Sequence, residues 1–350
     1  MRNPRDSMIS VGFTAFRATG LHRLMAPWTR GRGAILMFHH VRPAGREAFN
    51  PNGLLEITPD FLTGVIWLVR QRGFEIIGMD EAVTRINRPK QPGEKPFAVL
   101  TFDDGYWDNR DFALPVLQAL KAPFTLFITT GFADRSARLW WRELEAVIRG
   151  QDRIVLEGST RPVSQACRTD SEKAQAFTRA YWWLRRRPEP QMLDIIAGLC
   201  HRAGVDSEKL VASACMDWPA IEAISRDPLC TIGVHTLTHP MLARHDPARV
   251  RHEMAESRRL IEAHTGRPAL HFSYPVGDPA SAGEREFALA KSLGFSSAVT
   301  TRPGMVLDGH RDRLGSLPRL SVNGKWQSLA MVDVLLSGAP FALLNRGRPA

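Results

Sequence analysis

The stretch FAVLTFDDGYWDN at 97–109 ends an apolar run in two adjacent carboxylates. A short apolar run bounded by turn residues is typical of a buried strand, so Asp103 and Asp104 are expected at its carboxyl end. Two neighbouring carboxylates repel each other unless a cation intervenes. Because side chains alternate along a strand, one Asp can bind a metal ion while the other faces a water molecule or a cationic partner. The alternative is a plain Asp-Asp-Gly turn that closes the strand.

A second apolar run, in TIGVHTLTHP at 231–240, ends in His235, and His239 follows four residues later. Neutral imidazole is the most common metal-binding side chain. Two His and one Asp form a usual ligand set for zinc or a neighbouring divalent ion, with positions left open for water. A single His at a strand end is usually structural, whereas two at this spacing, together with the Asp pair, indicate a metal site.

A third stretch, HFSYPVGD at 271–278, predicts another strand that runs into a turn. Together the three stretches resemble the polysaccharide deacetylase family, the nodulation-type chitooligosaccharide deacetylase homology domain of carbohydrate esterase family four. The first family motif corresponds to TFDDG at 101–105, the second to HTLTH at 235–239 and the third to YPVG at 274–277. The resemblance runs over about 33–323, and its first two motifs are specific in combination.

The resemblance implies a metal-dependent enzyme that removes N-acetyl groups from N-acetylglucosamine units of an oligosaccharide or polysaccharide. It implies that Asp104, His235 and His239 bind the metal, with zinc as the first expectation and other transition metals as alternatives. It also implies that Asp103 is the general base on the attacking water and that the metal and a backbone N–H near Tyr106 hold the tetrahedral oxyanion. Four residues after the strand ends are expected to contact the substrate: Tyr106, Tyr274, Pro275 and Gly277.

The general acid is expected at an unusual place. Many relatives supply it from a His on a late strand, whereas the corresponding stretch AVTTRPG at 298–304 contains no His. His39, at the end of the buried run GAILMFHH, is the predicted acid, and His40 is the second candidate; the alternative is that both only cap their strand. Alternation along a strand lets only one of the two point inward. Arg319 could pair with Asp103 and hold it ionised, and a structural surface Arg is the alternative.

Strand-like and helix-like segments alternate along most of the chain, which indicates a parallel α/β sheet or barrel. About seven such units predict an incomplete or distorted TIM-like (β/α)7 barrel, in which chemistry lies at the carboxyl ends of the strands. A mainly helical insertion is expected at about 135–218, where the alternation stops. The expected division is therefore a basic arm over 1–32 and a deacetylase domain over 33–350. Four Trp of the insertion are expected in its core, with stacking on sugar rings as the alternative: Trp140, Trp141, Trp182 and Trp183.

The chain of 350 residues has a formal net charge of +10, and its arm over 1–32 holds six Arg against one Asp. The rest has no dense basic patch interleaved with aromatic residues, so a nucleic-acid partner is not expected. An anionic membrane surface is the expected partner of the arm. The mixed apolar and basic pattern over 10–28 predicts either an interfacial amphipathic helix or an ordinary helix packed on the domain.

The remaining features concern location and alternative functions. Four Cys without a CxxC pair are expected as buried free thiols, which fits a reducing compartment. Neither a run of 18 apolar residues nor a secretory signal is found, so we expect a cytoplasmic protein, with peripheral contact at the inner membrane face as an option. Two alternatives to a polymer deacetylase stay open: a deacetylase of a small or lipid-linked amidated sugar, and a carbohydrate-binding pseudoenzyme that lacks the late-strand His.

Overall fold

The computed structural model describes residues 16–45, 47–157 and 163–344. The strands have the following bounds: β1 Gly33–Phe38, β2 His40–Val41, β3 Glu56–Ile57, β4 Glu75–Ile76, β5 Phe97–Asp103, β6 Phe124–Ile128, β7 Arg153–Leu156, β8 Val163–Ala166, β9 Cys230–Val234, β10 His271–Ser273, β11 Ser297–Pro303 and β12 Leu317–Ser321. The first helices are α2 Leu21–Thr29, α3 Pro59–Gln71, α4 Met79–Asn87, α5 Leu114–Ala119, α6 Thr130–Ala133, α7 Trp140–Arg149 and α8 Asp170–Arg185. The later helices are α9 Glu189–Ala203, α10 Ser207–Ala214, α11 Trp218–Ser225, α12 Pro247–Thr265, α13 Glu284–Ser292, α14 Leu329–Leu336 and α15 Ala339–Leu344.

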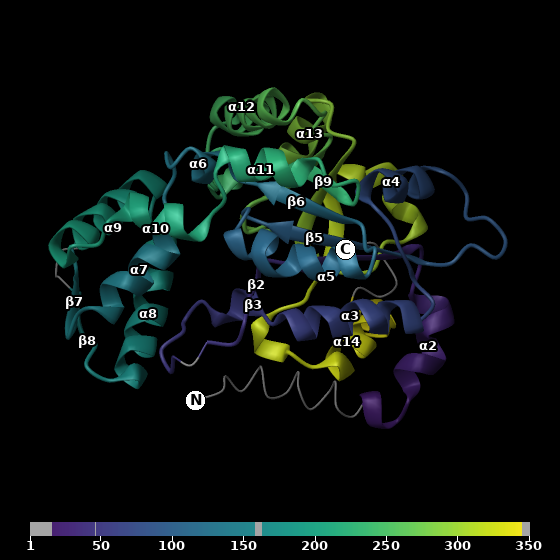
Figure 1. Cartoon of the computed structure of the whole chain (residues 1–350), viewed down its shortest axis with the longest axis horizontal. Coiled ribbons are helices and arrows are strands. Elements are labelled where there is room, and N and C mark those ends of the chain that lie inside the picture. Colours follow the sequence, from purple (N-terminus) through teal and green to yellow (C-terminus); the bar gives the residue numbers. More distant parts are fainter. Residues whose placement is uncertain (1–15, 46, 158–162, 345–350) are drawn as a thin grey trace.

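Seven parallel strands form a closed barrel in the order β1-β12-β11-β10-β9-β6-β5, which closes because β1 also pairs with β5. The short strand β4 adds to β5 outside this ring. Helices surround the barrel (Figure 1). The predicted incomplete TIM-like barrel of seven β/α units is therefore confirmed. Among the described helices, none is both long and apolar enough to cross a membrane.

The barrel strands are apolar over their whole length because both of their faces are covered. Strands β1, β5 and β6 consist of buried residues only. Alternate residues, among them Ile35, Val99 and Phe127, form a small core inside the barrel, and the residues between them join the main core under the helices. Parallel strands that are covered on both faces read as continuous hydrophobic runs, which is how they appear in this sequence.

Two helices show how local residues set the ends of the elements. The Thr58 side chain accepts a hydrogen bond from the Phe61 N–H at the start of α3, and Pro59 occupies the first helical position. Helix α12 begins after Asp246, whose side chain accepts from the Arg249 N–H, and it ends at Gly266 in the left-handed conformation. In both helices a side chain at the first turn satisfies a backbone N–H that has no partner within the helix.

Two helical segments depart from a single regular α-helix. A π-helical turn over Asn109–Ala113 is followed directly by the short helix α5. Pro115 lacks the N–H that would continue a regular ladder of hydrogen bonds, which explains the change of helix type. The pattern over 10–28 falls partly outside the described residues, and within them Gly20 (φ 67°) interrupts it, so that α2 begins only at Leu21.

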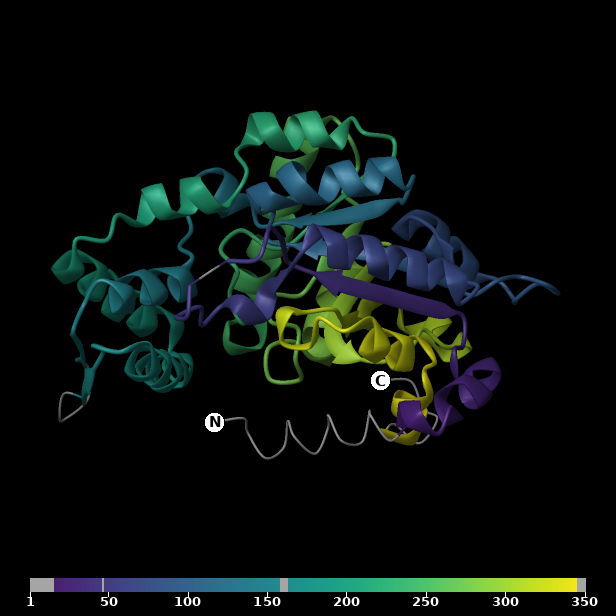
Figure 2. The ribbon, with the colours of Figure 1, turned by 60° about the horizontal axis from the view of Figure 1, so that its bottom comes forward.

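The chain leaves the barrel between α6 and β9, where it forms α7 to α10 and the hairpin β7–β8. Figures 1 and 2 show these elements beside the barrel. They share a hydrophobic core of their own around Leu144, Phe177 and Ile196, and Tyr106 and Phe132 from the barrel side join it. Because this part of the chain has its own core, it can form one side of a cleft without interrupting the closed ring of barrel strands. All four Cys are buried and free, as predicted.

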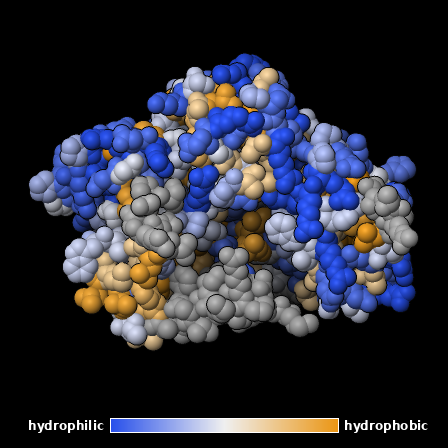
Figure 3. Space-filling model, turned by 180° about the vertical axis from the view of Figure 1, so that it is seen from behind, coloured by the Kyte–Doolittle hydropathy of each residue, from blue (hydrophilic) through white to orange (hydrophobic). Residues whose placement is uncertain are grey.

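Helix α2 packs on the domain through one face only. His22 and Ala26 are buried, and Arg23 and Arg72 both pair with the buried carboxylate of Asp333 on α14. The opposite face of α2 is exposed and apolar, and Figure 3 shows this apolar surface at lower left, over α2 and α15. Its largest exposed side chains are Leu21, Leu24 and Trp28. The helix is thus a packed helix with an uncovered apolar face among the described residues.

Candidate active site

The predicted site residues meet at the carboxyl ends of the barrel strands. Asp103 is the last residue of β5, and His235 directly follows β9. The loops that continue from these strands contain Asp104, Thr236 and His239, which all adopt positive φ angles of 60–74°. Such left-handed backbone is strained for residues other than Gly and persists only where the surroundings hold it. Three such residues in these two loops indicate that the backbone conformation orients the side chains of Asp104 and His239 toward each other.

Asp104, His235 and His239 form a cluster that could hold a metal ion. One ligand atom from each residue lies within 4.8 Å of the others. The Asp104 Oδ1 atom is 3.5 Å from His235 Nε2 and 3.4 Å from His239 Nε2. This Oδ1 is buried and accepts no hydrogen bond from the described residues, which is unusual for a buried carboxylate oxygen. A cation between the three groups would satisfy it.

The protonation states of the two imidazoles suit a metal ligand. His235 Nδ1 is 2.7 Å from the Ser273 carbonyl oxygen, which can only accept, so Nδ1 carries the proton and Nε2 presents its lone pair to Asp104. This is the usual outer-shell arrangement of a metal-binding His. Burial lowers the pKa of His239 to about 4, outweighing the opposite effect of Asp104, so this ring is neutral at pH 7. The His239 ring can therefore bind a cation without first losing a proton.

Glu253 on α12 holds the loop between the two His, and sequence reasoning missed it. Its carboxylate accepts hydrogen bonds from the backbone N–H groups of Leu237 and Thr238 and from the Thr238 hydroxyl, at 3.0, 2.9 and 2.6 Å. The side chain is 3% exposed. A single Glu in a helix of mixed polarity does not indicate a functional residue in the sequence. Only the folded structure shows that Glu253 contacts the HTLTH loop.

Asp103 has a different partner from Asp104. Both of its oxygens accept hydrogen bonds at 2.8 Å from the guanidinium of Arg319, which is 1% exposed. The same guanidinium also donates to the hydroxyl groups of Thr101 and Ser273. Burial is the largest single influence and would raise the pKa of Asp103, but the charge and hydrogen bonds of Arg319, together with the neighbouring His, outweigh it and hold this pKa well below its usual range. The expected pairing is confirmed, and the alternative of a surface Arg is wrong.

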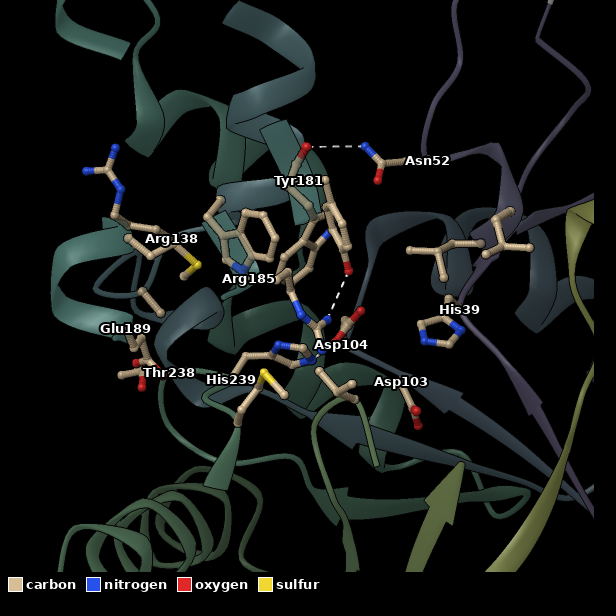
Figure 4. A pocket seen from close by; sticks show the side chains of 18 of the residues that line it. His39, Asn52, Asp103, Asp104, Arg138, Tyr181, Arg185, Glu189, Thr238 and His239 are labelled. Carbon is tan, nitrogen blue, oxygen red and sulfur yellow. Dashed lines mark hydrogen bonds and ion pairs between the residues drawn. The ribbon is translucent and has the colours of Figure 1, made fainter. Parts of the chain in front are cut away.

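His39 and His40 point in different directions, as alternation requires. His39 lines the same pocket as Asp103 and Asp104, and Figure 4 shows its ring beside them. Burial is the main cause of its lowered pKa, although the two carboxylates act in the opposite direction. His40 instead hydrogen-bonds Asp108 at 2.7 Å through Nδ1 and stacks on Tyr106. The pocket position therefore belongs to His39, whereas its role as an acid stays a prediction.

The side chains of Tyr106 and Tyr274 lie outside the pocket lining. Tyr106 is fully buried under His40, with a ring separation of 3.6 Å. Tyr274 is also fully buried, and its hydroxyl donates to the Gly315 carbonyl oxygen at 2.9 Å. Pro275 and Gly277 are buried too, and only Val276 of this turn reaches the pocket. The structure thus gives these residues the position of supports for the pocket wall.

The metal-site cluster opens into one pocket of about 760 Å³ between the barrel mouth and the helices of 140–203. Trp141 lies against His239, with ring centroids 5.0 Å apart, and Trp140 follows at 5.9 Å from Trp141. Both Trp are buried, as predicted, yet both also line the pocket. Trp182 is 54% exposed and lines it as well, so core packing is the wrong expectation for this residue.

Solved structures with the same fold are known. The Streptococcus pyogenes deacetylase PplD in complex with acetate matches with a TM-score of 0.55 at 17% identity, over 90% of this chain and 98% of that chain. BC0361, a polysaccharide deacetylase from Bacillus cereus, matches with a TM-score of 0.53 at 15% identity, over 87% of this chain and 68% of that chain. At these identities the likeness shows a shared fold.

Sequence comparison adds the family. A Bacillus subtilis (strain 168) protein named "Putative polysaccharide deacetylase YxkH" is 32% identical over 94 residues, which are 27% of this chain and 30% of that protein. The match therefore spans less than a third of that relative. The family model described as polysaccharide deacetylase matches residues 90–298, which include both TFDDG and HTLTH. This match covers more than half of the chain, and the chain belongs to the polysaccharide deacetylase family.

Proposed function

We propose that the protein is a metal-dependent hydrolase that removes N-acetyl groups from N-acetylglucosamine units of an oligosaccharide or polysaccharide. One observation carries the proposal: three ligand atoms with free lone pairs converge beside a second carboxylate that Arg319 keeps ionised. Asp104, His235 and His239 would hold the metal, and zinc suits two imidazoles and one carboxylate. The orphaned Asp104 Oδ1 supports a cation at this place.

The residues divide the reaction into two proton transfers. A bound divalent metal would lower the pKa of a water molecule and polarise the amide carbonyl. Asp103 accepts a proton from the attacking water, whose oxygen adds to the amide carbon. His39 gives a proton to the amide nitrogen as the carbon–nitrogen bond breaks, and acetate and the free amine leave. The depressed pKa of Asp103 keeps this carboxylate ionised at neutral pH but makes it a weak base, so that activation of the water by the cation is required.

Acetate release tests the proposal directly. The zinc-loaded protein should release acetate from tri-N-acetylchitotriose and leave a free amine on the product. O-acetylated xylan serves as a control, because it offers an ester and no acetamide. Acetate from neither substrate, together with measurable binding of the chitotriose, would favour the carbohydrate-binding pseudoenzyme instead.

His39→Ala should retain the metal and lower kcat about 10²–10⁴-fold, because an amine is too basic to leave without a proton. An acid must be protonated to act, so the titration of His39 sets the basic limb of the pH profile, where activity falls as the pH rises. Since burial lowers the pKa of His39, this limb should begin below the usual range of His. The variant should lose this limb and keep the acidic one. His40→Ala provides the comparison, and normal turnover of His39→Ala would assign the acid to another group.

The exposed face of α2 is proposed to contact anionic membrane. Leu24 and Trp28 are 66% and 78% exposed, and the exposed Arg17 and Arg23 flank them. Apolar side chains with neighbouring cations suit the interface of an anionic leaflet. The double variant Leu24→Ser, Trp28→Ser should lower co-sedimentation with phosphatidylglycerol vesicles roughly tenfold. Leu54→Ser, Trp67→Ser is the matched control pair of exposed apolar residues outside α2, and equal loss in both pairs would argue against a specific contact.

A further inference from the structure

The outer part of the pocket combines aromatic side chains with guanidinium groups, and its chemistry differs from that of the metal site. An aromatic series leads away from the metal-site cluster: Trp140 stacks on Tyr181 at 5.0 Å, and Tyr181 meets Trp182 at 5.3 Å. Met192 and Met241 add aliphatic surface to the same lining. Figure 4 shows Tyr181 and Arg185 on the insertion side of the pocket, facing Asp104 and His239. A neutral sugar needs no such aliphatic wall.

The charge of this region is positive. Five Arg line the pocket: Arg138, Arg185, Arg187, Arg244 and Arg249. The carboxylates of Glu143 and Glu189 neutralise Arg138 and Arg249. The other three have no carboxylate partner among residues 16–45, 47–157 and 163–344.

Arg185 is the most available of the three. It donates to the Tyr181 hydroxyl at 3.0 Å, and its guanidinium lies 5.6 Å from the ring centre of Tyr181 and 5.9 Å from that of Trp182. These contacts orient the guanidinium and leave further N–H donors free, since the group has five. Arg187 and Arg244 are engaged mainly with backbone carbonyl oxygens. A guanidinium held on an aromatic wall is suited to a phosphate, which it can bind through two parallel hydrogen bonds.

Resting on the function proposed above, we infer that the substrate is an N-acetylated sugar that carries a phosphate ester of an apolar group. The sugar reaches the metal-site cluster, the phosphate meets Arg185, and the apolar group lies along Trp182, Met192 and Met241. Two sources supply an N-acetylated sugar joined to a phosphate ester, a lipid-linked sugar phosphate and a nucleotide sugar. The aliphatic lining favours the lipid chain, whereas a nucleobase would use the aromatic rings.

Four probes separate the parts of this substrate. They are N-acetylglucosamine 1-phosphate, its decyl ester, decyl N-acetylglucosaminide and UDP-N-acetylglucosamine, each compared with tri-N-acetylchitotriose by acetate release from the zinc-loaded full chain. The decyl phosphate ester should have a kcat/KM at least tenfold above that of either probe that lacks the phosphate or the chain. A higher value for UDP-N-acetylglucosamine would assign the nucleotide as the source. Equal values for all probes, including the chitotriose, would overturn the inference and leave the deacetylase proposal intact.

Variants with matched controls locate the two contacts. Arg185→Gln should raise the KM of the decyl phosphate ester roughly tenfold, with a smaller effect on decyl N-acetylglucosaminide. Trp182→Ala should raise the KM of both decyl probes. The controls are Arg186→Gln, an exposed neighbour outside the pocket lining, and Trp67→Ala, which is 52% exposed elsewhere. Unchanged KM values in Arg185→Gln and Trp182→Ala would contradict these contacts.

Binding without turnover distinguishes the two proposals. Decyl phosphate has no acetamide, so its binding can be followed through Trp fluorescence whether or not the protein is a deacetylase. If no probe releases acetate while decyl phosphate binds the wild type and binds Arg185→Gln about tenfold more weakly, the proposed function fails and the anionic apolar site stands. If decyl phosphate does not bind while the chitotriose is deacetylated, the site is refuted and the function stands.

Discussion

Replacing Asp103 with Asn should lower kcat about 10²–10⁴-fold and leave one metal ion per chain, because Asn cannot accept a proton from the attacking water. Asp103 faces Arg319 through both oxygens and contributes no atom to the metal-site cluster. Asp104→Asn should instead lose the metal, since Asp104 supplies the oxygen on which both His converge. Metal content by elemental analysis and acetate release, measured on the same samples, separate the two Asp. Equal metal loss in both variants would reverse their roles.

The Asp103 variant needs a control for folding. It leaves Arg319 buried without its anion, which can cost about 3–5 kcal/mol of stability. The double variant Asp103→Asn, Arg319→Gln removes the unpaired charge and should recover part of the melting temperature without recovering turnover. Recovery of activity together with stability would show that the single variant lost activity only because it unfolded.

His235→Ala and His239→Ala should each lower metal affinity roughly 100-fold or more and abolish turnover at limiting zinc, because each removes one of three ligands. Added zinc should restore little activity, because the two remaining ligands no longer fix the position of the metal ion relative to Asp103. The burial that lowers the pKa of His239 to about 4 predicts in addition that the wild type keeps its metal at pH 5.5, where an ordinary His would be largely protonated. Competition with a chromogenic chelator measures both effects.

His201→Ala is the control for the His variants, because His201 is exposed on α9 and is not one of the three residues of the metal-site cluster. It should keep full metal content and normal turnover. Full metal retention in both His235→Ala and His239→Ala would refute the assigned ligand set.

The barrel and its metal-site cluster could be predicted because their signals are local. Strands covered on both faces give unbroken apolar runs. The run of β5 ends at Asp103, and the run of β9 ends directly before His235. Since the carboxyl ends of parallel strands meet at one end of a barrel, the residues at those ends must come together. The same reasoning placed only one of His39 and His40 in the pocket.

The rest depends on packing between distant segments. Glu253 accepts hydrogen bonds from the HTLTH loop, and it lies on α12. In the sequence this helix shows only a polar and an apolar side. The exposure of Trp182 depends on how α8 packs on the core of the insertion. The buried Tyr274 hydroxyl donates to the carbonyl oxygen of Gly315, which is 41 residues away in the sequence. Nothing in the local pattern distinguishes a Trp that anchors a helix from one that lines a pocket. The aromatic and guanidinium wall therefore became visible only in the folded chain.

Metal dependence can be tested by titrating zinc into metal-free wild-type protein. The readout is acetate release from tri-N-acetylchitotriose and from the decyl ester of N-acetylglucosamine 1-phosphate. We expect no release without metal, a linear rise on addition of zinc, and saturation at one equivalent per chain for whichever substrate is used. Acetate release at full rate in the presence of excess chelator, from either substrate, would contradict a metal-dependent deacetylase built on Asp104, His235 and His239.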